Sequence, residues 1–292
     1  MGTQINYYCY LLLFKAIALI PLSLLYSVSN LMYYILYDVI HYRRNIVRTN
    51  LSNCFPEKNI NEILCIEQKF YHHFCDLFLE TIKLLHVTEK DINDRIVVDN
   101  TELIEKSALN NRPIILYLGH YGNWEWVTAV SQHYQIPKKT FQIYKPLRNK
   151  AFNLLMLKIR SRFNTISVSQ KTALRSILNT HKQMSSLIVG CIADGRPNKK
   201  TEKGPGMKFL NQQTDFMVGA ELIGRKIGAT FLYLDVTKQA RGKYKFTVKE
   251  LIPAEEDKQY PYTKAFYRML EKTITREPSY WLWTHNRWLH NQ

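Results

Sequence analysis

The chain has 292 residues, of which 46% are hydrophobic, so it can bury a substantial core and is not a disordered protein. Its formal charge of +16 requires an acidic partner such as nucleic acid, anionic lipid or an acidic carrier protein, and charge alone does not choose between them. The five cysteines are an odd set without C-x-x-C spacing, so the sequence indicates neither a disulfide framework nor a zinc site.

The N-terminal segment is strongly apolar. Residues 16–37 contain no charged side chain, and a run of this length can span a bilayer. The apolar character begins earlier, at Tyr7, and is broken only by Lys15. No basic residue precedes Tyr7 and no small-residue cleavage site follows the run, so we expect a retained membrane-anchoring helix that Pro21 kinks or starts. A flat interfacial helix and a buried core helix are the alternatives. The excess of positive charge just after the run predicts that the catalytic body lies on the cytoplasmic side of the membrane. The residues that carry it are His41, Arg43, Arg44 and Arg48.

The rest of the chain predicts two further regions. Helical periodicity over residues 59–85 indicates an amphipathic helical annex, and beyond Arg112 strands alternate with helices. We expect strands at 114–118, 140–144, 187–192, 230–236 and 244–251, and helices at 124–133, 149–163, 172–182, 215–227 and 262–275. The alternation predicts an α/β class with a mixed sheet flanked by helices. The expected organisation is an anchor at 1–40, a helical annex at 41–110 and an α/β core at 111–292.

A candidate catalytic pair follows the first predicted strand of the core. Gly119 follows the strand directly. His120 and Glu125 are five positions apart, at what is predicted to be a strand-to-helix turn. Asn123 is expected to cap the helix that carries Glu125. A carboxylate that accepts a hydrogen bond from an imidazole fixes the ring's tautomer and leaves the other nitrogen free to take a proton from a hydroxyl. The spacing alone is weak, but the strand and the glycines strengthen it.

These residues resemble the bacterial lipid A biosynthesis acyltransferases, the lauroyl and myristoyl transferases of the lysophospholipid acyltransferase superfamily. The family's H-x4-D/E motif falls on His120 and Glu125. The resemblance extends over almost the whole chain, through residues 42–47, 54–56, 144–149 and 280–288. The family's Asp-Gln pair reads Asp194-Gly195 here, and a Phe-Phe-Gly-like turn reads Lys208 to Asn211. These departures leave the acyl group and the acceptor open.

The resemblance also implies substrate-binding residues. Arg160, with Arg162 as second choice, matches a basic residue near the family's active site, where an arginine fork would hold a phosphate or a developing oxyanion. The alternative is a solvated helix face. Asp194 matches the family's aspartate, and a helix cap or turn is its alternative. Tyr144 and Asn123 complete the expected site. The aromatic tail at 280–288 is expected to act as a membrane-interface belt, a packing element, or both.

The function implied is acyl transfer from a thioester, most simply on acyl carrier protein, to a hydroxyl of a lipid A precursor in the bacterial inner membrane. His120 would be the general base and Glu125 would orient it, with no metal and no cofactor. The expected partners are the acyl carrier protein, the lipid acceptor and the bilayer, and no nucleic acid. Acylation of a lysophospholipid or another glycolipid is the nearest alternative. A non-catalytic, membrane-tethered protein that binds anionic lipid or nucleic acid is the alternative from another class.

Overall fold

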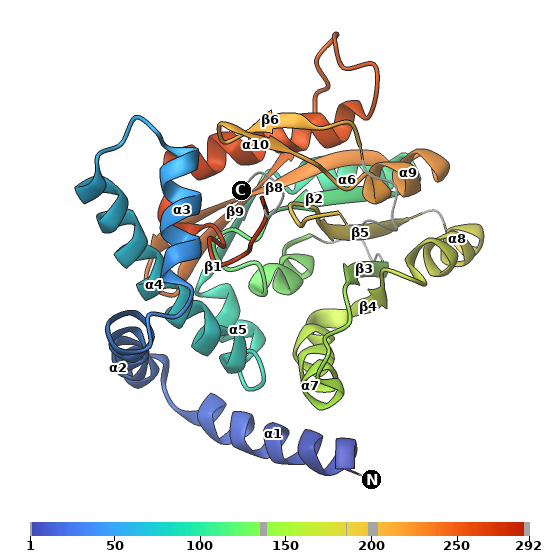
Figure 1. Ribbon diagram of the computed structural model, residues 1–292. Helices are drawn as coiled ribbons and strands as arrows, with labels where there is room; N and C mark the ends of the chain where they lie inside the picture. The colour runs from blue at the N-terminus through green and yellow to red at the C-terminus, as the bar shows by residue number, and fades with distance from the viewer. Residues whose placement is uncertain (1, 135–138, 185, 198–203, 289–292) are drawn as a thin grey trace.

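A seven-stranded mixed sheet forms the centre of the molecule (Figure 1). The computed structural model describes residues 2–134, 139–184, 186–197 and 204–288. The strand order is β1-β9-β8-β2-β5-β3-β4, and a separate two-stranded sheet pairs β6 with β7. The strands are β1 (Ile96–Asp99), β2 (Ile114–Leu118), β3 (Lys139–Tyr144), β4 (Thr165–Ser169), β5 (Leu187–Ile192), β6 (Met207–Phe209), β7 (Gln212–Thr214), β8 (Thr230–Ala240) and β9 (Lys243–Glu250).

The central strand β2 explains why residues 114–118 read as an unbroken apolar run. All five side chains are buried, because parallel neighbours and packed helices cover both faces of the strand. β2 pairs in parallel with β5 on one side and β8 on the other, and Leu118 is in register with Ile192. The loops that leave β2 and β5 therefore begin side by side at one edge of the sheet.

Helices and short helical turns connect and flank the strands. The α-helices are α1 (Gly2–Leu19), α2 (Leu22–Tyr33), α3 (Arg44–Cys54), α4 (Ile60–Lys83), α5 (Glu89–Asn93), α6 (Glu102–Leu109), α7 (Lys150–Arg160), α8 (Ala173–Gln183), α9 (Gly219–Lys226) and α10 (Pro261–Arg276). A π-helical segment, η1 (Tyr34–Val39), continues α2, and three 3₁₀ segments are η2 (Trp126–His133), η3 (Arg162–Asn164) and η4 (Pro278–Tyr280). The predicted mixed α/β class is confirmed.

Several elements differ from the sequence prediction, including the following two. The helix expected at 124–133 is the 3₁₀ segment η2, which begins at Trp126. The annex region contributes an edge strand, because β1 pairs in parallel with β9. β1 has only four residues, and only Ile96 is buried, so it lacks the apolar run that marks the central strands.

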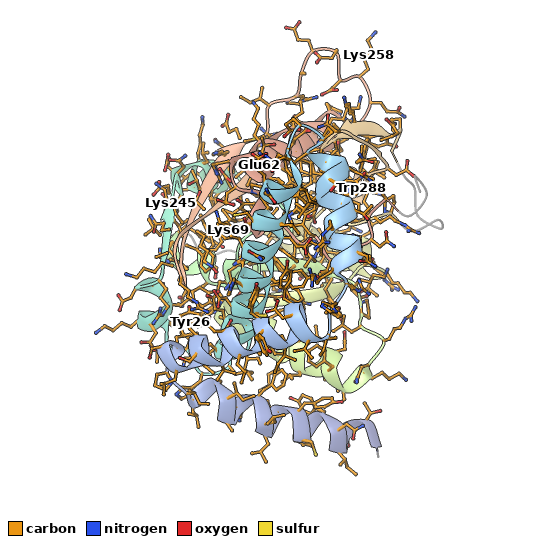
Figure 2. All side chains as sticks on the ribbon, turned by 60° about the vertical axis from the view of Figure 1, so that its left-hand side comes forward. Tyr26, Glu62, Lys69, Lys245, Lys258 and Trp288 are labelled. Carbon is orange, nitrogen blue, oxygen red and sulfur yellow. The ribbon has the colours of Figure 1, made fainter. Side chains whose placement is uncertain are left out.

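The N-terminal segment is a bent pair of helices rather than one spanning helix. Among the described residues no single helix is long and apolar enough to cross a membrane, although α1 together with α2 and η1 passes that test as a pair bent by 116°. Pro21 lies at the break and starts α2, since proline cannot continue a helix without losing a hydrogen bond and clashing with the preceding turn. Figure 2 shows α1 along one end of the molecule, with side chains that project away from the body.

Candidate active site

His120 lies on the loop that leaves the buried end of β2. The close packing of this loop requires both of its glycines. A side chain at Gly119 would meet Leu270 at 2.6 Å, and one at Gly122 would meet Val236 at 2.6 Å. Gly122 also has a φ of +60°, in the left-handed region that favours glycine. The sharp turn predicted from the two glycines is therefore present.

The imidazole of His120 is held by the carboxylate of Asp194. His120 Nδ1 lies 2.7 Å from Asp194 Oδ1, and the backbone N–H of His120 donates to Asp194 Oδ2 at 2.8 Å. Asp194 follows β5, and Ala193 N donates to Leu118 O, which extends the β2–β5 ladder to the edge of the site. Neighbouring strands thus bring together two residues that lie 74 positions apart in the sequence.

The surroundings of Asp194 keep it ionised. Its side chain is 2% exposed, whereas that of His120 is 32% exposed. Burial alone raises the pKa of the Asp194 carboxyl, but the charge and hydrogen bonds of His120, the charge of Arg287 and the hydrogen bond from Trp281 outweigh it and hold the pKa below its ordinary value. An ionised carboxylate only accepts, so Nδ1 of His120 carries a hydrogen, and whenever the ring is neutral the lone pair is on Nε2.

Glu125 pairs with Arg160 and not with His120. Arg160 Nε donates to Glu125 Oε2 at 2.8 Å, and its second nitrogen, Nη2, donates to Oε1 at 2.5 Å. The expected Glu125–His120 hydrogen bond does not form among the described residues, because Arg160 occupies both carboxylate oxygens and Asp194 occupies the imidazole Nδ1. Glu125 therefore ties the loop to the end of α7, and the orienting carboxylate is Asp194.

Asn123 was expected to cap a helix, but the N-cap position of η2 is Glu125, and Asn123 instead lies deep in the protein and bonds across the turn that precedes η2. Its Oδ1 accepts from Trp126 N at 3.1 Å, and its Nδ2 donates to Glu80 Oε2 at 2.7 Å. Asn123 and Glu80 are completely buried. Glu80 lies on α4 and also accepts hydrogen bonds from Tyr244 and Tyr26. Asn123 thus positions the loop and presents no surface to a substrate in this structure.

The other expected binding residues lie around α7. Arg162 follows α7 and donates to the carbonyl oxygens of Leu85 and Val87, at 3.0 Å and 2.6 Å. Tyr144 ends β3, is partly buried, and accepts from Gln170 N through its carbonyl oxygen. The structure therefore places Tyr144 at the end of the strand that precedes α7 and anchors Arg162 to the chain after α4.

The C-terminal tail is a packing element that supports the His120 loop. Trp281, Trp283 and Trp288 are all buried, so these tryptophans do not form an interface belt. Trp281 Nε1 donates to Asp194 Oδ2 at 2.8 Å. Leu282 N donates to His120 O, and Gly122 N donates to Tyr280 O. The tail thus contacts both partners of the His–Asp pair.

The comparisons identify the family. The model for the bacterial lipid A biosynthesis acyltransferases matches residues 3–290, which is almost the whole chain. The chain belongs to this family. No curated protein matches the chain. The family supports an acyltransferase.

Several supporting residues of this acyltransferase were not predicted. Glu80 and His73 lie on the buried face of α4, seven positions apart, and contact the loop through Asn123 and Gly122. Polar side chains on the core-facing side of an amphipathic helix were the available signal. Arg287 is also buried, with Nη2 on the hydroxyl of Tyr267, which in turn donates to Ala193 O beside Asp194.

Proposed function

We propose that this acyltransferase moves a fatty acyl chain from a thioester on acyl carrier protein to a hydroxyl of a lipid A precursor. The observation that carries the proposal is the pairing of a partly exposed His120 with a buried, ionised Asp194 at the edge of the sheet. The family supplies the reaction class, and the pair supplies a group able to accept a proton.

In the proposed mechanism, Nε2 of His120 takes the proton of the acceptor hydroxyl as its oxygen attacks the thioester carbonyl. Asp194 stabilises the imidazolium that forms, without taking its proton. The tetrahedral intermediate then expels the thiolate, and the imidazolium returns the proton to the sulfur. An ester bond forms as the thioester bond breaks, and His120 ends neutral. A thioester is already activated, so removing the hydroxyl proton is the main task of the protein.

Glu125 and Arg160 have a positioning role in this proposal. The two charges make a bidentate pair that is largely removed from solvent, with exposures of 8% and 21%. Breaking such a pair leaves one buried charge uncompensated. The Glu125–Arg160 pair fixes the segment after His120 against α7 and so fixes the direction in which the imidazole faces.

The bent helix pair is proposed to seat the enzyme in the bacterial inner membrane, with the catalytic body on the cytoplasmic face. Large apolar side chains of this pair are exposed, a pattern that in a soluble protein marks an interaction surface. They include Tyr8, Leu12, Leu13, Leu19, Leu24, Leu31, Tyr34 and Val39. An enzyme seated in this way meets an acceptor that stays in the bilayer.

The test is acyl transfer by the purified protein from carrier-bound acyl chains to a lipid A precursor, with products weighed by mass spectrometry. His120→Ala should abolish transfer, and Asp194→Asn should reduce kcat by about 10² to 10⁴, because an amide does not enforce the productive tautomer. His86→Ala, at an exposed histidine on the connection after α4, is the matched control and should leave kcat unchanged.

Three outcomes would contradict the proposal. Full activity of His120→Ala would remove the general base. Products found only on a lysophospholipid or another glycolipid would reassign the acceptor. Binding to vesicles without any acylated product from the wild-type protein would favour a non-catalytic binding protein.

A further inference from the structure

A basic hollow lies beside the contact between α1 and α7. It has a volume of about 340 Å³ and is lined by Lys15, Leu85, Lys158, Ser161 and Arg162. Three of these five residues are cations and none is acidic. The hollow is distinct from the His120–Asp194 pair, since neither residue lines it.

Lys15 is the only charged residue between positions 2 and 37. At 100° per residue, its side chain falls between the buried Ala18 on one side and the exposed Leu12 and Leu19 on the other. The neighbouring Phe14 packs against Phe152 of α7, with ring centroids 6.1 Å apart. Lys15 therefore stands at the border between the face of α1 that packs on the protein and the face that is apolar and exposed.

The other cations are held in place around the same hollow. Arg162 uses Nη1 and Nη2 to bond the carbonyl oxygens of Leu85 and Val87, which fixes its guanidinium beside the end of α4. Within the described part of the chain, the ammonium groups of Lys15 and Lys158 have no carboxylate partner. Three like charges that face one space repel each other, and an anion in that space would relieve the repulsion.

We propose that this hollow binds the phosphate group of a lipid at the bilayer surface. Ammonium and guanidinium groups are strong donors to phosphate oxygens. The apolar residues of α1 beside Lys15 favour a lipid over an acidic protein, because they would contact acyl chains while Lys15 reaches the headgroup level. The site rests on the proposed seating of α1 and α2 in the bilayer, but it does not depend on acyl transfer.

The test measures binding of the full-length protein to phosphatidylcholine vesicles with and without phosphatidylglycerol, by flotation. The variant is the double substitution Lys15→Gln and Lys158→Gln, which spares Arg162 and its backbone bonds. A lysine near an anionic surface contributes about fivefold to the binding constant, so the double variant should lose about 25-fold on anionic vesicles and little on neutral ones.

The matched control removes the same charge next to the hollow. Lys145→Gln with Lys150→Gln changes two exposed lysines in the loop before α7 and at its first turn, neither of which lines the hollow. It should lose no more than about fivefold. An equal loss in both double variants would show general attraction between charges and would overturn the site. The site would also be overturned if the wild type showed no preference for anionic vesicles. A double variant that lost binding to an acidic protein but kept its binding to anionic vesicles would overturn it too.

Two further measurements are needed. One distinguishes lipid-borne from free phosphate, and the other distinguishes failure of this site from failure of the proposed acyl transfer. Release from anionic vesicles by sodium phosphate, beyond that caused by sodium chloride of equal ionic strength, would show that free phosphate also occupies the site. Equal release would show a site specific for lipid-borne phosphate. His120→Ala should bind vesicles like the wild type. If the wild type bound no vesicles of either kind, the seating of the helix pair would fail, and acyl transfer to a detergent-dispersed acceptor would still test the reaction.

Discussion

His73 on α4 is a buried ionisable side chain that contacts the loop carrying His120. Its Nε2 lies 3.2 Å from Gly122 O, and because a carbonyl only accepts, Nε2 carries the hydrogen. Nδ1 is then free to accept from Lys238 Nζ at 3.3 Å. Burial, and then the charge of Lys238, hold the pKa of His73 well below its ordinary value, so the ring is neutral in the folded protein.

This neutral histidine makes stability depend on pH. The unfolded chain protonates His73 near pH 6.5 and the folded chain does not, so the unfolded state binds more protons below that pH and stability falls as pH falls. The contribution of His73 is about 1.4 kcal/mol between about pH 7.5 and about pH 5.5. Urea unfolding of His73→Gln should show a smaller loss over this range than the wild type, while His86→Gln, at an exposed histidine, should not. An unchanged pH dependence in His73→Gln would contradict the assignment.

At the scale of single residues, the sequence identified the imidazole but not its carboxylate. His120 was recognisable because an apolar strand and two glycines surround it in a continuous segment. Glu125 was expected to orient it because it is near in the sequence, yet Arg160 binds it. Asp194 was expected only as a binding or capping residue. Which carboxylate reaches the ring depends on strand order, since β5 must lie beside β2, and no local pattern encodes that neighbour.

The turn after β2 is the element on which the site depends most directly. Gly122 combines a φ of +60° with close contact to Val236, and its N–H donates to Tyr280 O in the tail. Gly228 has a similar φ of +63° but no atom within 4 Å of an added Cβ. Substitutions at Gly122 and Gly228 therefore distinguish the cost of backbone strain from the cost of steric crowding.

We expect Gly228→Ala to lower the free energy of unfolding by about 1–2 kcal/mol through strain alone. Gly122→Ala should lower it by about 2–5 kcal/mol, because overpacking adds to the strain, and should also lower kcat by moving His120. Urea unfolding and acyl transfer measure the two effects. Adding Val236→Ala to Gly122→Ala should recover part of the lost stability. Equal losses for the two glycine variants would show that the contact with Val236 is unimportant.

The sequence predicts a helix or strand correctly where a local residue pattern is enough to determine it. β2 and β5 begin and end at the expected residues because both are short apolar runs with a clear start, after Pro113 and Ser186 respectively. The helix α4 begins after Asn59, whose side chain caps it together with Glu62. β4 was missed because it alternates small polar and apolar residues, and only Thr165 and Val168 are buried. The break at Pro21 was expected, but the size of the bend depends on packing against α4 and α7.

At the scale of the whole molecule, apolar exposure is unevenly distributed. Leu12 on α1 is 74% exposed and Leu24 on α2 is 59% exposed, at the end of the molecule where the helix pair lies (Figures 1 and 2). Leu109, at the end of α6, is 78% exposed, and Figure 1 shows α6 away from α1 and α2. Leu109 is at least as exposed as Leu12 and Leu24, so it is a suitable control for them.

Leu12→Glu and Leu24→Glu should each weaken binding to neutral vesicles by at least about tenfold, since burial of a leucine side chain contributes about 1.5–3 kcal/mol and a charge adds a desolvation cost. Leu109→Glu should leave vesicle binding unchanged. Flotation measures binding, and thermal unfolding in detergent should show all three variants to be folded. Equal weakening by Leu109→Glu would mean that this face has no special contact with lipid.

His120 and Asp194 are 74 positions apart in the sequence, and the chain between them passes through β3, α7, β4 and α8 before it returns along β5. The separation of the two side chains is set by the spacing of adjacent strands and not by the length of the chain between them. This connecting segment can therefore lengthen or shorten during evolution while the His120–Asp194 pair stays in place, provided that one arginine remains for Glu125. The geometry of the pair is, in this architecture, independent of the length of chain that joins its two members.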